Sequence, residues 1–346
     1  KQIAMPVFQP FRQSVLCLLL PVIIMAGCTG PDTLERTYFS GEVQGTYYTV
    51  TYYSPDGRNF QDAIDSLLKE FDQTASLWVD SSMINRVNNN EDVIVNDDFL
   101  ELFRISQEVS EMTDGCFDIT VGPLVKAWGF GPEKEPQIGR GTVDSLLPLV
   151  GFRKILIRNN RIIKTDPRVK LDFNAVAQGY SVDLVAGFLE SKGIENYLVD
   201  IGGEVYGHGE KPGNKQWKVG IEKPAEDQSS DREITAEIPI TNLAVATSGN
   251  YRKYYEKEGV RYSHTIDPHT GSPIRHSLLS VTVVAASCAY ADAYATAFMV
   301  MGVDSALLFI ERKQPGVEAY FIYSGKDGVY KILMTEGLKK SMKEIR

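Results

Sequence analysis

The sequence predicts an α+β fold in which helices pack on mixed, largely antiparallel sheets. Two observations support this. Strand patterns and helix patterns both occur along the chain, and they do not follow the steady β-α-β order of a parallel sheet. The chain is also long enough to bury a sizeable core, because its 346 residues are 43% hydrophobic and 23% charged.

The N-terminal elements follow from composition and hydrophobic spacing. Residues 37–54 are rich in Tyr, Val and Thr and predict a strand or hairpin. Apolar residues recur at helical spacing over 60–71 and predict an amphipathic helix. A second helix should begin after Asn96, where acidic residues fill the first turn, and end before Gly115.

The middle of the chain alternates between both kinds of element. Residues 154–165 predict a hairpin with Asn159-Asn160 at its turn. A helix is expected from about Ala177 to Lys192, followed over 196–212 by two strands with a Gly-Gly break between them.

The C-terminal elements come after a polar surface loop at 223–233, which lies within the domain because a strand pattern resumes behind it. Residues 261–268 alternate like a strand and lead into a tight turn. The last part predicts a helix over 304–313, a strand over 317–323 and, after a Gly-Lys-Asp-Gly turn, another strand.

The charge and the absent motifs exclude several classes of function. A net charge of −9 and a pI near 5.1 argue against nucleic-acid binding, since no basic stripe is present. No GxGxxG or GxxxxGK[ST] follows a strand pattern, which excludes Rossmann and P-loop phosphate sites. A polyanionic ligand must therefore be held by backbone N–H groups or by a metal ion.

The N-terminus predicts a lipoprotein signal. The apolar run 15–27 follows Arg12, is too short to span a membrane and ends in small residues before Cys28, as in a bacterial lipobox. An ordinary cleaved signal or a buried helix are the alternatives. We therefore expect residues 1–27 to be a signal peptide, 28–36 a short tether and 37–346 one domain. Cys116 and Cys288 fit neither a disulfide framework nor a zinc motif.

Five stretches of the domain carry side chains suited to chemistry. Asp292 and Thr296 are four residues apart in an alanine-rich helical segment, so their oxygens share one face and could hold a hard cation. On this evidence alone, ordinary hydrogen bonding of the pair is favoured. Asp172 ends a strand just before a helix N-terminus that suits a phosphate, although Asn174 could simply cap that helix.

The other three stretches carry aromatic or titratable side chains. Residues 114–132 place Phe117 and two further aromatic residues beside glycines, which could hold a flat ring or merely pack a core; Trp78 lies beside polar residues elsewhere. His264 stands between Ser263 and Asp267, where a surface or core histidine is the usual outcome.

Taken together and in order, these stretches resemble the ApbE family of FAD:protein FMN transferases from bacterial periplasms. The resemblance covers about residues 37–335. Its motifs are GEVQGTYY, SLWVDSSMINRVN, TDGCFDITVGPLVKAWGFGP, LDFNAVAQGYSVD, LVDIGGEVYGHG, ATSGNYRKYY, YSHTIDPHTGSP and ADAYATA. Eight ordered motifs of this length make chance an untenable explanation.

The resemblance implies an activity and a metal site. Family members transfer FMN from FAD to a threonine or serine hydroxyl of an acceptor protein, with Mg²⁺, and release AMP. The implied metal ligands are the carbonyl of Ala175, the carboxylate of Asp292 and the hydroxyl of Thr296, between two interlocked subdomains. Asp292 is thereby implied as a catalytic residue as well, together with His264, which matches a histidine proposed to help deprotonate the acceptor hydroxyl.

The resemblance also implies a set of FAD contacts. These are Gln44, Trp78, Cys116, Phe117, Asp118, Asp172, Gln178, Ser263, His264 and Ile266. Two of them depart from the common family pattern: Gln44 replaces a frequent methionine, and Gln178 replaces the usual lysine or glutamate. The second departure removes a charge beside the cofactor.

Two rival functions share much of this pattern. An FAD pyrophosphatase would use the same residues with water as acceptor, giving FMN and AMP. A flavin-storage lipoprotein would bind FAD without chemistry. Storage needs no Lewis acid, so the implied metal ligands argue against it. The implied partners are FAD, an acceptor protein and, through a lipid on Cys28, the membrane, with no nucleic acid. We expect the protein on the periplasmic side of a bacterial cell envelope.

Overall fold

The computed structural model describes residues 34–130, 138–139, 141–224, 233–250, 254–257, 260–313 and 315–344. Residues 34–346 form one compact unit. The predicted signal peptide and the predicted lipidation site Cys28 lie outside the described residues, as does most of the predicted loop at 223–233. Within the described ranges, no helix combines the length and apolarity that crossing a membrane requires.

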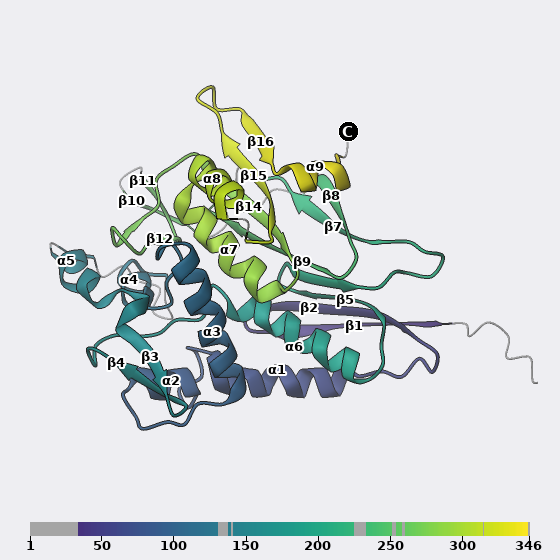
Figure 1. The fold of residues 1–346 in the computed structure, drawn as a ribbon, viewed down its shortest axis with the longest axis horizontal. Helices are drawn as coiled ribbons and strands as arrows, with labels where there is room; N and C mark the ends of the chain where they lie inside the picture. Colours follow the sequence, from purple (N-terminus) through teal and green to yellow (C-terminus); the bar gives the residue numbers. More distant parts are fainter. Residues whose placement is uncertain are drawn as a thin grey trace, which may run out of the picture. The chain divides into compact units, whose positions relative to one another are not determined.

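An eight-stranded sheet organises the fold, in the strand order β1-β2-β5-β6-β9-β14-β15-β16 (Figure 1). Every neighbouring pair in it is antiparallel. The strands are β1 (Glu35–Val43), β2 (Thr46–Ser54), β5 (Asn196–Ile201), β6 (Glu204–His208), β9 (Leu243–Gly249), β14 (Leu278–Ala285), β15 (Glu318–Ser324) and β16 (Tyr330–Met334). This confirms the predicted α+β class.

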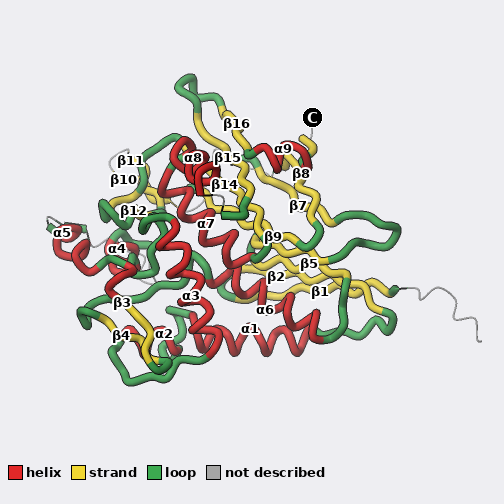
Figure 2. Tube along the Cα trace, viewed as in Figure 1, coloured by secondary structure: helices red, strands yellow, loops and turns green. Residues whose placement is uncertain are grey.

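One face of this sheet is covered by helices, as the separation of red and yellow segments in Figure 2 shows. The helices are α1 (Gln61–Ala75), α3 (Asp97–Met112), α6 (Ala177–Ser191), α7 (Cys288–Met301) and α8 (Val303–Lys313). Their apolar faces share one core with alternate residues of the strands, including Tyr48, Val50 and Tyr52 of β2. The alternation follows from the two-residue period of a strand.

The other face of the sheet packs on a small second sheet. The order of that sheet is β17-β8-β7, and its strands are β7 (Trp217–Glu222), β8 (Ile234–Ile240) and β17 (Lys343–Glu344). Trp217, Ile238 and Ile240 pack there with Val245 and Tyr320 of the large sheet. The central strand β14 is therefore buried on both sides, which explains why its sequence is apolar almost without interruption.

The remaining elements are short. The helices are α2 (Met83–Asn88), α4 (Gly122–Ala127), α5 (Thr142–Leu146), α9 (Glu336–Ser341) and the 3₁₀ turns Leu147–Leu149 and Phe152–Lys154. The strands are β3 (Ile155–Arg158), β4 (Arg161–Lys164), β10 (Tyr254–Lys257), β11 (Val260–Ser263), β12 (Ile266–Asp267) and β13 (Ser272–Pro273).

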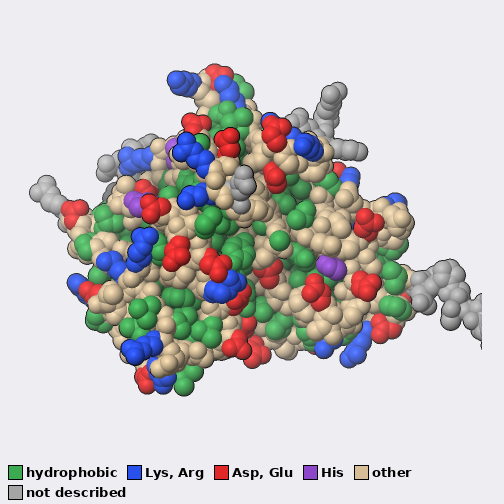
Figure 3. Space-filling model, viewed as in Figure 1, with side chains coloured by type: hydrophobic (Ala, Val, Ile, Leu, Met, Phe, Trp, Pro, Cys, Tyr) green, Lys and Arg blue, Asp and Glu red, His purple; other side chains and the backbone are tan. Residues whose placement is uncertain are grey.

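Most predicted boundaries hold within a few residues. The β3–β4 turn has Asn159 and Asn160 at φ 51° and 55°, as a two-residue hairpin loop requires. The helix predicted at 60–71 runs four residues longer, to Ala75, because Thr74 and Ala75 also face the core. The strand predicted at 261–268 is instead divided between β11 and β12, with His264 and Thr265 outside both. Figure 3 shows charged side chains of both signs mixed over one face of the molecule.

Candidate active site

The centre of the candidate site is the crossing of α6 and α7. Helix α7 presents small residues there, with buried alanines throughout its length. A Cβ atom added to Gly179 would lie 2.8 Å from the carbonyl carbon of Cys288 and 2.9 Å from the Cβ of Asp292. Only glycine permits this separation, so the small side chains bring the backbones of the two helices together.

Asp292 points from α7 into the first turn of α6. Its side chain is 7% exposed, and its Oδ2 accepts a hydrogen bond from the N–H of Gly179 at 3.1 Å. Burial raises the pKa of this carboxyl to about 7, and the bond from Gly179 opposes the rise only partly. A carboxylate has acceptor capacity for more than one bond, and a bound cation would restore its charged form.

Thr296 and Ala175 complete the predicted metal ligands. Thr296 lies one turn beyond Asp292 on the same face of α7, with its Oγ1 3.4 Å from the Oγ of Ser248 in β9. Ala175 precedes α6. In a continuous helix its carbonyl would receive the N–H of Gly179, four residues later, but that N–H donates to Asp292 instead. The Ala175 carbonyl is thereby left for another partner.

Gln178 holds a buried acid that the sequence reasoning missed. Its Nε2 donates to the carbonyl of Ile201 at 2.9 Å and to the carboxylate of Glu204. Glu204 is buried, and burial together with the negative charge of Asp292 raises its pKa well above the ordinary value. Gly202 makes the approach possible: it has φ +64°, and a Cβ there would overlap the Gln178 amide. An acidic residue directly after the Gly-Gly break was the available signal.

Gln44 reaches α6 from the other side. It lies in the β1–β2 turn at φ 53°, and its Nε2 donates to the Oγ of Ser181, one turn beyond Gln178. The turn and α1 line a surface hollow that includes Asp65 and Asp72. Burial raises the pKa of Asp72, and a hydrogen bond from Gln44 opposes this. Gln44 is therefore positioned between the hollow and the start of α6.

The predicted contacts at 116–118 have mainly protein partners. Asp118 accepts hydrogen bonds from the N–H of Thr120 at 2.8 Å, its hydroxyl at 2.6 Å and the N–H of Phe152 at 2.7 Å. Phe117 is 2% exposed in the main core, so its ring packs against protein atoms. Cys116 is half-buried, and burial raises the pKa of its thiol to about 11, which keeps it protonated at neutral pH.

Asp172 lies in the loop that leads into α6, and the strand predicted to end at this residue is not formed. Its backbone N–H donates to the carbonyl of Ile119 at 2.7 Å, which joins it to the Asp118 segment, and its carboxylate accepts from the N–H of Asn174 at 2.8 Å. Burial raises its pKa to about 6. Asn88 fixes the preceding residue through two hydrogen bonds to the backbone of Leu171. Asn174 does not cap α6, as the alternative would require. The N-cap residue of that helix is Val176, whose side chain makes no capping hydrogen bond.

Residues 263–266 lie beside the segment that carries Trp128 and Phe130. The ring of His264 is half-buried and stands edge-on to Phe130, with 6.2 Å between ring centres. Ser263 is buried, and its Oγ accepts from the N–H of Thr265 at 3.2 Å. Ile266 packs with Trp128 in a small separate core.

Two hydrogen bonds tie this segment to the rest of the site. His269 Nε2 lies 2.8 Å from the carbonyl oxygen of Asp114, and Trp128 donates from Nε1 to the carbonyl of Gly271 at 2.8 Å. Trp78, by contrast, is 61% exposed on the loop between α1 and α2. The predicted residues thus form one group at the α6–α7 crossing and a second group across loops 114–130, 172 and 263–271.

The donor set at the crossing fits a hard divalent cation. It combines a buried carboxylate of raised pKa, a hydroxyl on the same helix face and a carbonyl outside the helical hydrogen-bond ladder. These are the oxygen ligands that Mg²⁺ prefers. Among the described residues, no three His, Cys, Asp or Glu side chains cluster as a metal site.

The fold and this crossing define a class of protein: an α+β protein whose helix N-terminus and oxygen donors suit an anionic ligand held with a cation. More particularly, the chain belongs to the ApbE family, because the model of that family matches residues 44–321. This confirms the resemblance.

Similar proteins and structures span nearly the whole chain. The FAD:protein FMN transferase of Vibrio cholerae is 38% identical over 308 residues, 86% of this chain and 91% of that protein. The Escherichia coli K12 protein of the same name is 32% identical over 325 residues, 89% and 91% of the two chains. The solved flavin transferase ApbE from Vibrio cholerae superposes with a TM-score of 0.79 at 36% identity, covering 89% of this chain and 99% of that one.

Proposed function

We propose that the protein transfers FMN from FAD to a serine or threonine hydroxyl of an acceptor protein, with Mg²⁺, and releases AMP. Relatives that carry the name FAD:protein FMN transferase, up to 38% identical over most of the chain, support the transferase reaction. The single structural observation that carries the metal assignment is the buried Asp292 carboxylate aimed at the first turn of α6.

The start of α6 supplies the groups that suit a diphosphate. The first N–H groups of a helix have no intrahelical acceptor and lie at the positive end of its dipole. No side chain caps α6 at Val176. The N–H groups of Val176 and Ala177 donate to the carbonyl of Phe173, and that of Gly179 donates to Asp292, which leaves the N–H of Gln178 for a ligand. The phosphate oxygens of FAD could accept hydrogen bonds there. An acidic protein without a basic cluster needs such donors to hold a diphosphate.

Ala175, Asp292 and Thr296 would hold the metal ion. When bound there, Mg²⁺ would neutralise charge on the diphosphate and stabilise the charge that develops as the bond to AMP breaks. Asp292 must be ionised to act as a ligand, and its raised pKa means that metal binding and proton release are linked.

The reaction balances without a further reagent. The acceptor oxygen forms a bond to the FMN-side phosphorus, the phosphorus–oxygen bond to AMP breaks, and the hydroxyl proton leaves. His264 is the proposed proton acceptor, since the unprotonated nitrogen of a neutral imidazole can take a proton. The rest of the site would act mainly by orienting the two substrates.

The test combines the purified protein with FAD, MgCl₂ and a candidate acceptor. A fluorescent flavin band on a denaturing gel, with AMP formed in equal amount, is the expected result. Free FMN and AMP without a labelled protein would instead identify an FAD pyrophosphatase. Tight FAD binding without AMP, with or without Mg²⁺, would identify a storage protein.

We also propose that a lipid on Cys28 anchors the protein to the periplasmic side of a bacterial membrane. The support is the sequence alone: an apolar run of 13 residues ends in Ala-Gly immediately before the cysteine. A diacyl modification is strong enough for stable anchoring, whereas a single chain gives only marginal binding.

A further inference from the structure

Helices α6 and α7 cap each other. Asp292 of α7 accepts the N–H of Gly179, in the first turn of α6, at 3.1 Å. In return, Asp183 of α6 accepts the N–H groups of Cys288 at 2.8 Å and Ala289 at 2.9 Å, which are the first two residues of α7. Each helix therefore supplies a carboxylate to the other's N-terminus.

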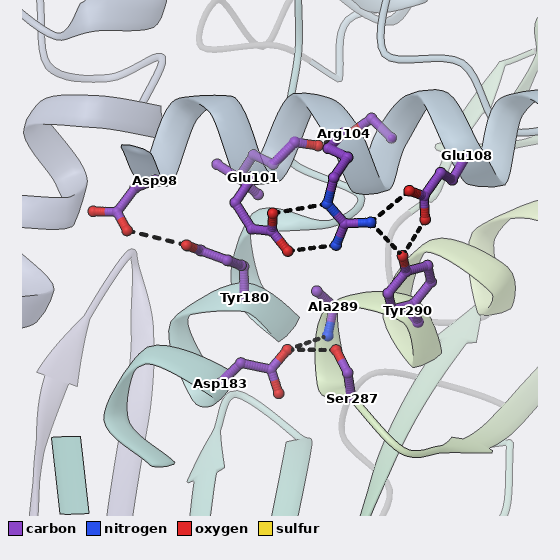
Figure 4. A network of polar contacts seen from close by, with 11 residues as sticks. Asp98, Glu101, Arg104, Glu108, Tyr180, Asp183, Ser287, Ala289 and Tyr290 are labelled. Carbon is purple, nitrogen blue, oxygen red and sulfur yellow. Dashed lines mark hydrogen bonds and ion pairs between the residues drawn. The ribbon is translucent and has the colours of Figure 1, made fainter. Parts of the chain in front are cut away.

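The start of α7 depends on this carboxylate from its neighbour. Ser287 occupies the N-cap position, but its side chain makes no cap bond to its own helix. Its hydroxyl donates to Asp183 at 2.8 Å instead, as Figure 4 shows. Burial raises the pKa of Asp183, and its three hydrogen bonds oppose the rise because each of them favours the carboxylate.

The capped turn directly precedes the residues assigned to the metal. Asp292 lies one turn after Cys288 on α7, and Thr296 lies one turn further. A helix is stiff over two turns, so the position of its first turn fixes where both side chains stand against α6. Gly179 allows the close approach, and the hydrogen bonds of Asp183 join the first turn of α7 to α6.

We propose that Asp183 is a positioning residue: by capping α7 from α6, it holds Asp292 and Thr296 in the arrangement that binds Mg²⁺. The proposal rests on the metal site of the proposed function. Partners that orient metal ligands from outside the ligand set typically change metal affinity by about 10- to 100-fold when removed.

A purely electrostatic role would give a different pattern. The negative charge of Asp183 would also attract a cation bound at Asp292, so its removal would weaken cation binding even without movement. Asp183→Asn and Asp183→Ala remove the same charge, but the asparagine keeps one oxygen acceptor for α7. Ser287→Ala keeps the charge and removes one of the three donors.

The experiment measures Mg²⁺ binding by calorimetry on the full chain saturated with FAD, without acceptor. Relative to the unmodified protein, we expect affinity to fall about 3-fold in Ser287→Ala, about 10-fold in Asp183→Asn and more than about 30-fold in Asp183→Ala. The matched control is Tyr180→Phe, which removes the 3.0 Å hydrogen bond from α6 to Asp98 of α3 and leaves the α7 cap intact (Figure 4). Its Mg²⁺ affinity should stay within about 2-fold.

Equal losses in both Asp183 variants, with Ser287→Ala unchanged, would overturn positioning in favour of a charge effect alone. Unchanged affinity throughout the series, or loss in Tyr180→Phe as large as in Asp183→Asn, would overturn it as well. If Asp183→Ala does not fold, the losses of Mg²⁺ affinity in Ser287→Ala and Asp183→Asn still distinguish the two roles. Positioning lowers the affinity of both variants, whereas a charge effect alone lowers only that of Asp183→Asn. A protein that shows the graded losses but transfers no FMN refutes the proposed function and leaves the positioning role standing.

Discussion

Replacing Gly179 by alanine tests whether the separation of α6 and α7 sets the site. The new methyl carbon would lie 2.8 Å from the carbonyl carbon of Cys288 and 2.9 Å from the Cβ of Asp292. Carbon atoms pack at about 3.5–4.0 Å, so α7 would have to move away by about 1 Å. Neither neighbour is the end of a flexible side chain, and the whole helix must therefore shift.

The matched control is Gly187→Ala in the same helix. Gly187 is exposed, and a Cβ there meets nothing within 4 Å. Both substitutions gain up to about 1 kcal/mol from the better helix propensity of alanine. Only Gly179→Ala also incurs overpacking, which costs about 1–3 kcal/mol. The difference between the two free energies of unfolding isolates that overpacking cost.

Urea unfolding followed by circular dichroism gives the two stabilities, and calorimetry gives the Mg²⁺ affinities with FAD bound. We expect Gly187→Ala to be slightly stabilised and to bind Mg²⁺ normally. Gly179→Ala should be less stable than this control by about 1–3 kcal/mol and bind Mg²⁺ at least about 10-fold more weakly, since Asp292 moves with α7. Two variants of equal stability and equal Mg²⁺ affinity would refute the reasoning.

Three further predictions concern named side chains. Asp292→Ala should lower FMN transfer by more than about 100-fold while weakening FAD binding less; unchanged turnover at saturating Mg²⁺ would contradict the ligand assignment. Without metal, stability should fall as pH rises from about 4 to 7, because burial raises the folded-state pKa of Asp292 to about 7 and the folded state holds the proton longer; Asp292→Asn should flatten this slope in pH-dependent urea unfolding. Cys28→Ser should move the protein from the membrane to the soluble fraction on immunoblots, and persistence in the membrane fraction would exclude the lipid anchor.

Local signals in the sequence were sufficient for most elements of the fold. The Tyr, Val and Thr content of residues 37–54 predicted β1 and β2, and the helical spacing from Ile64 to Phe71 predicted most of α1. The sequence pattern of each of these elements reflects which of its faces is buried. The strand order of the large sheet could not be predicted in this way, because β5 pairs with β2 across more than a hundred residues.

The candidate site was predictable only in its parts. The spacing of Asp292 and Thr296 shows that they share a helix face, but on its own it favoured ordinary hydrogen bonding. The partners that decide their role, Gly179 and Asp183, lie more than a hundred residues away on another helix. Glu204 was missed for the same reason: its place directly after the Gly-Gly break was visible in the sequence, but Gln178, beside which it is buried, lies on another element.

The acids around the α6–α7 crossing explain how an acidic protein can prepare a site for a cation. Asp183 is held by the first turn of α7, Asp292 by the first turn of α6, and Glu204 by the amide of Gln178. Burial raises the pKa of all three, so the protein without a cation bears the free-energy cost of enclosing them. A divalent cation bound by Asp292 offsets part of that cost and favours the ionised form. In the proposed function, cation binding and the docking of α7 on α6 would therefore stabilise each other, because a ligand that binds only the folded arrangement shifts the equilibrium towards it.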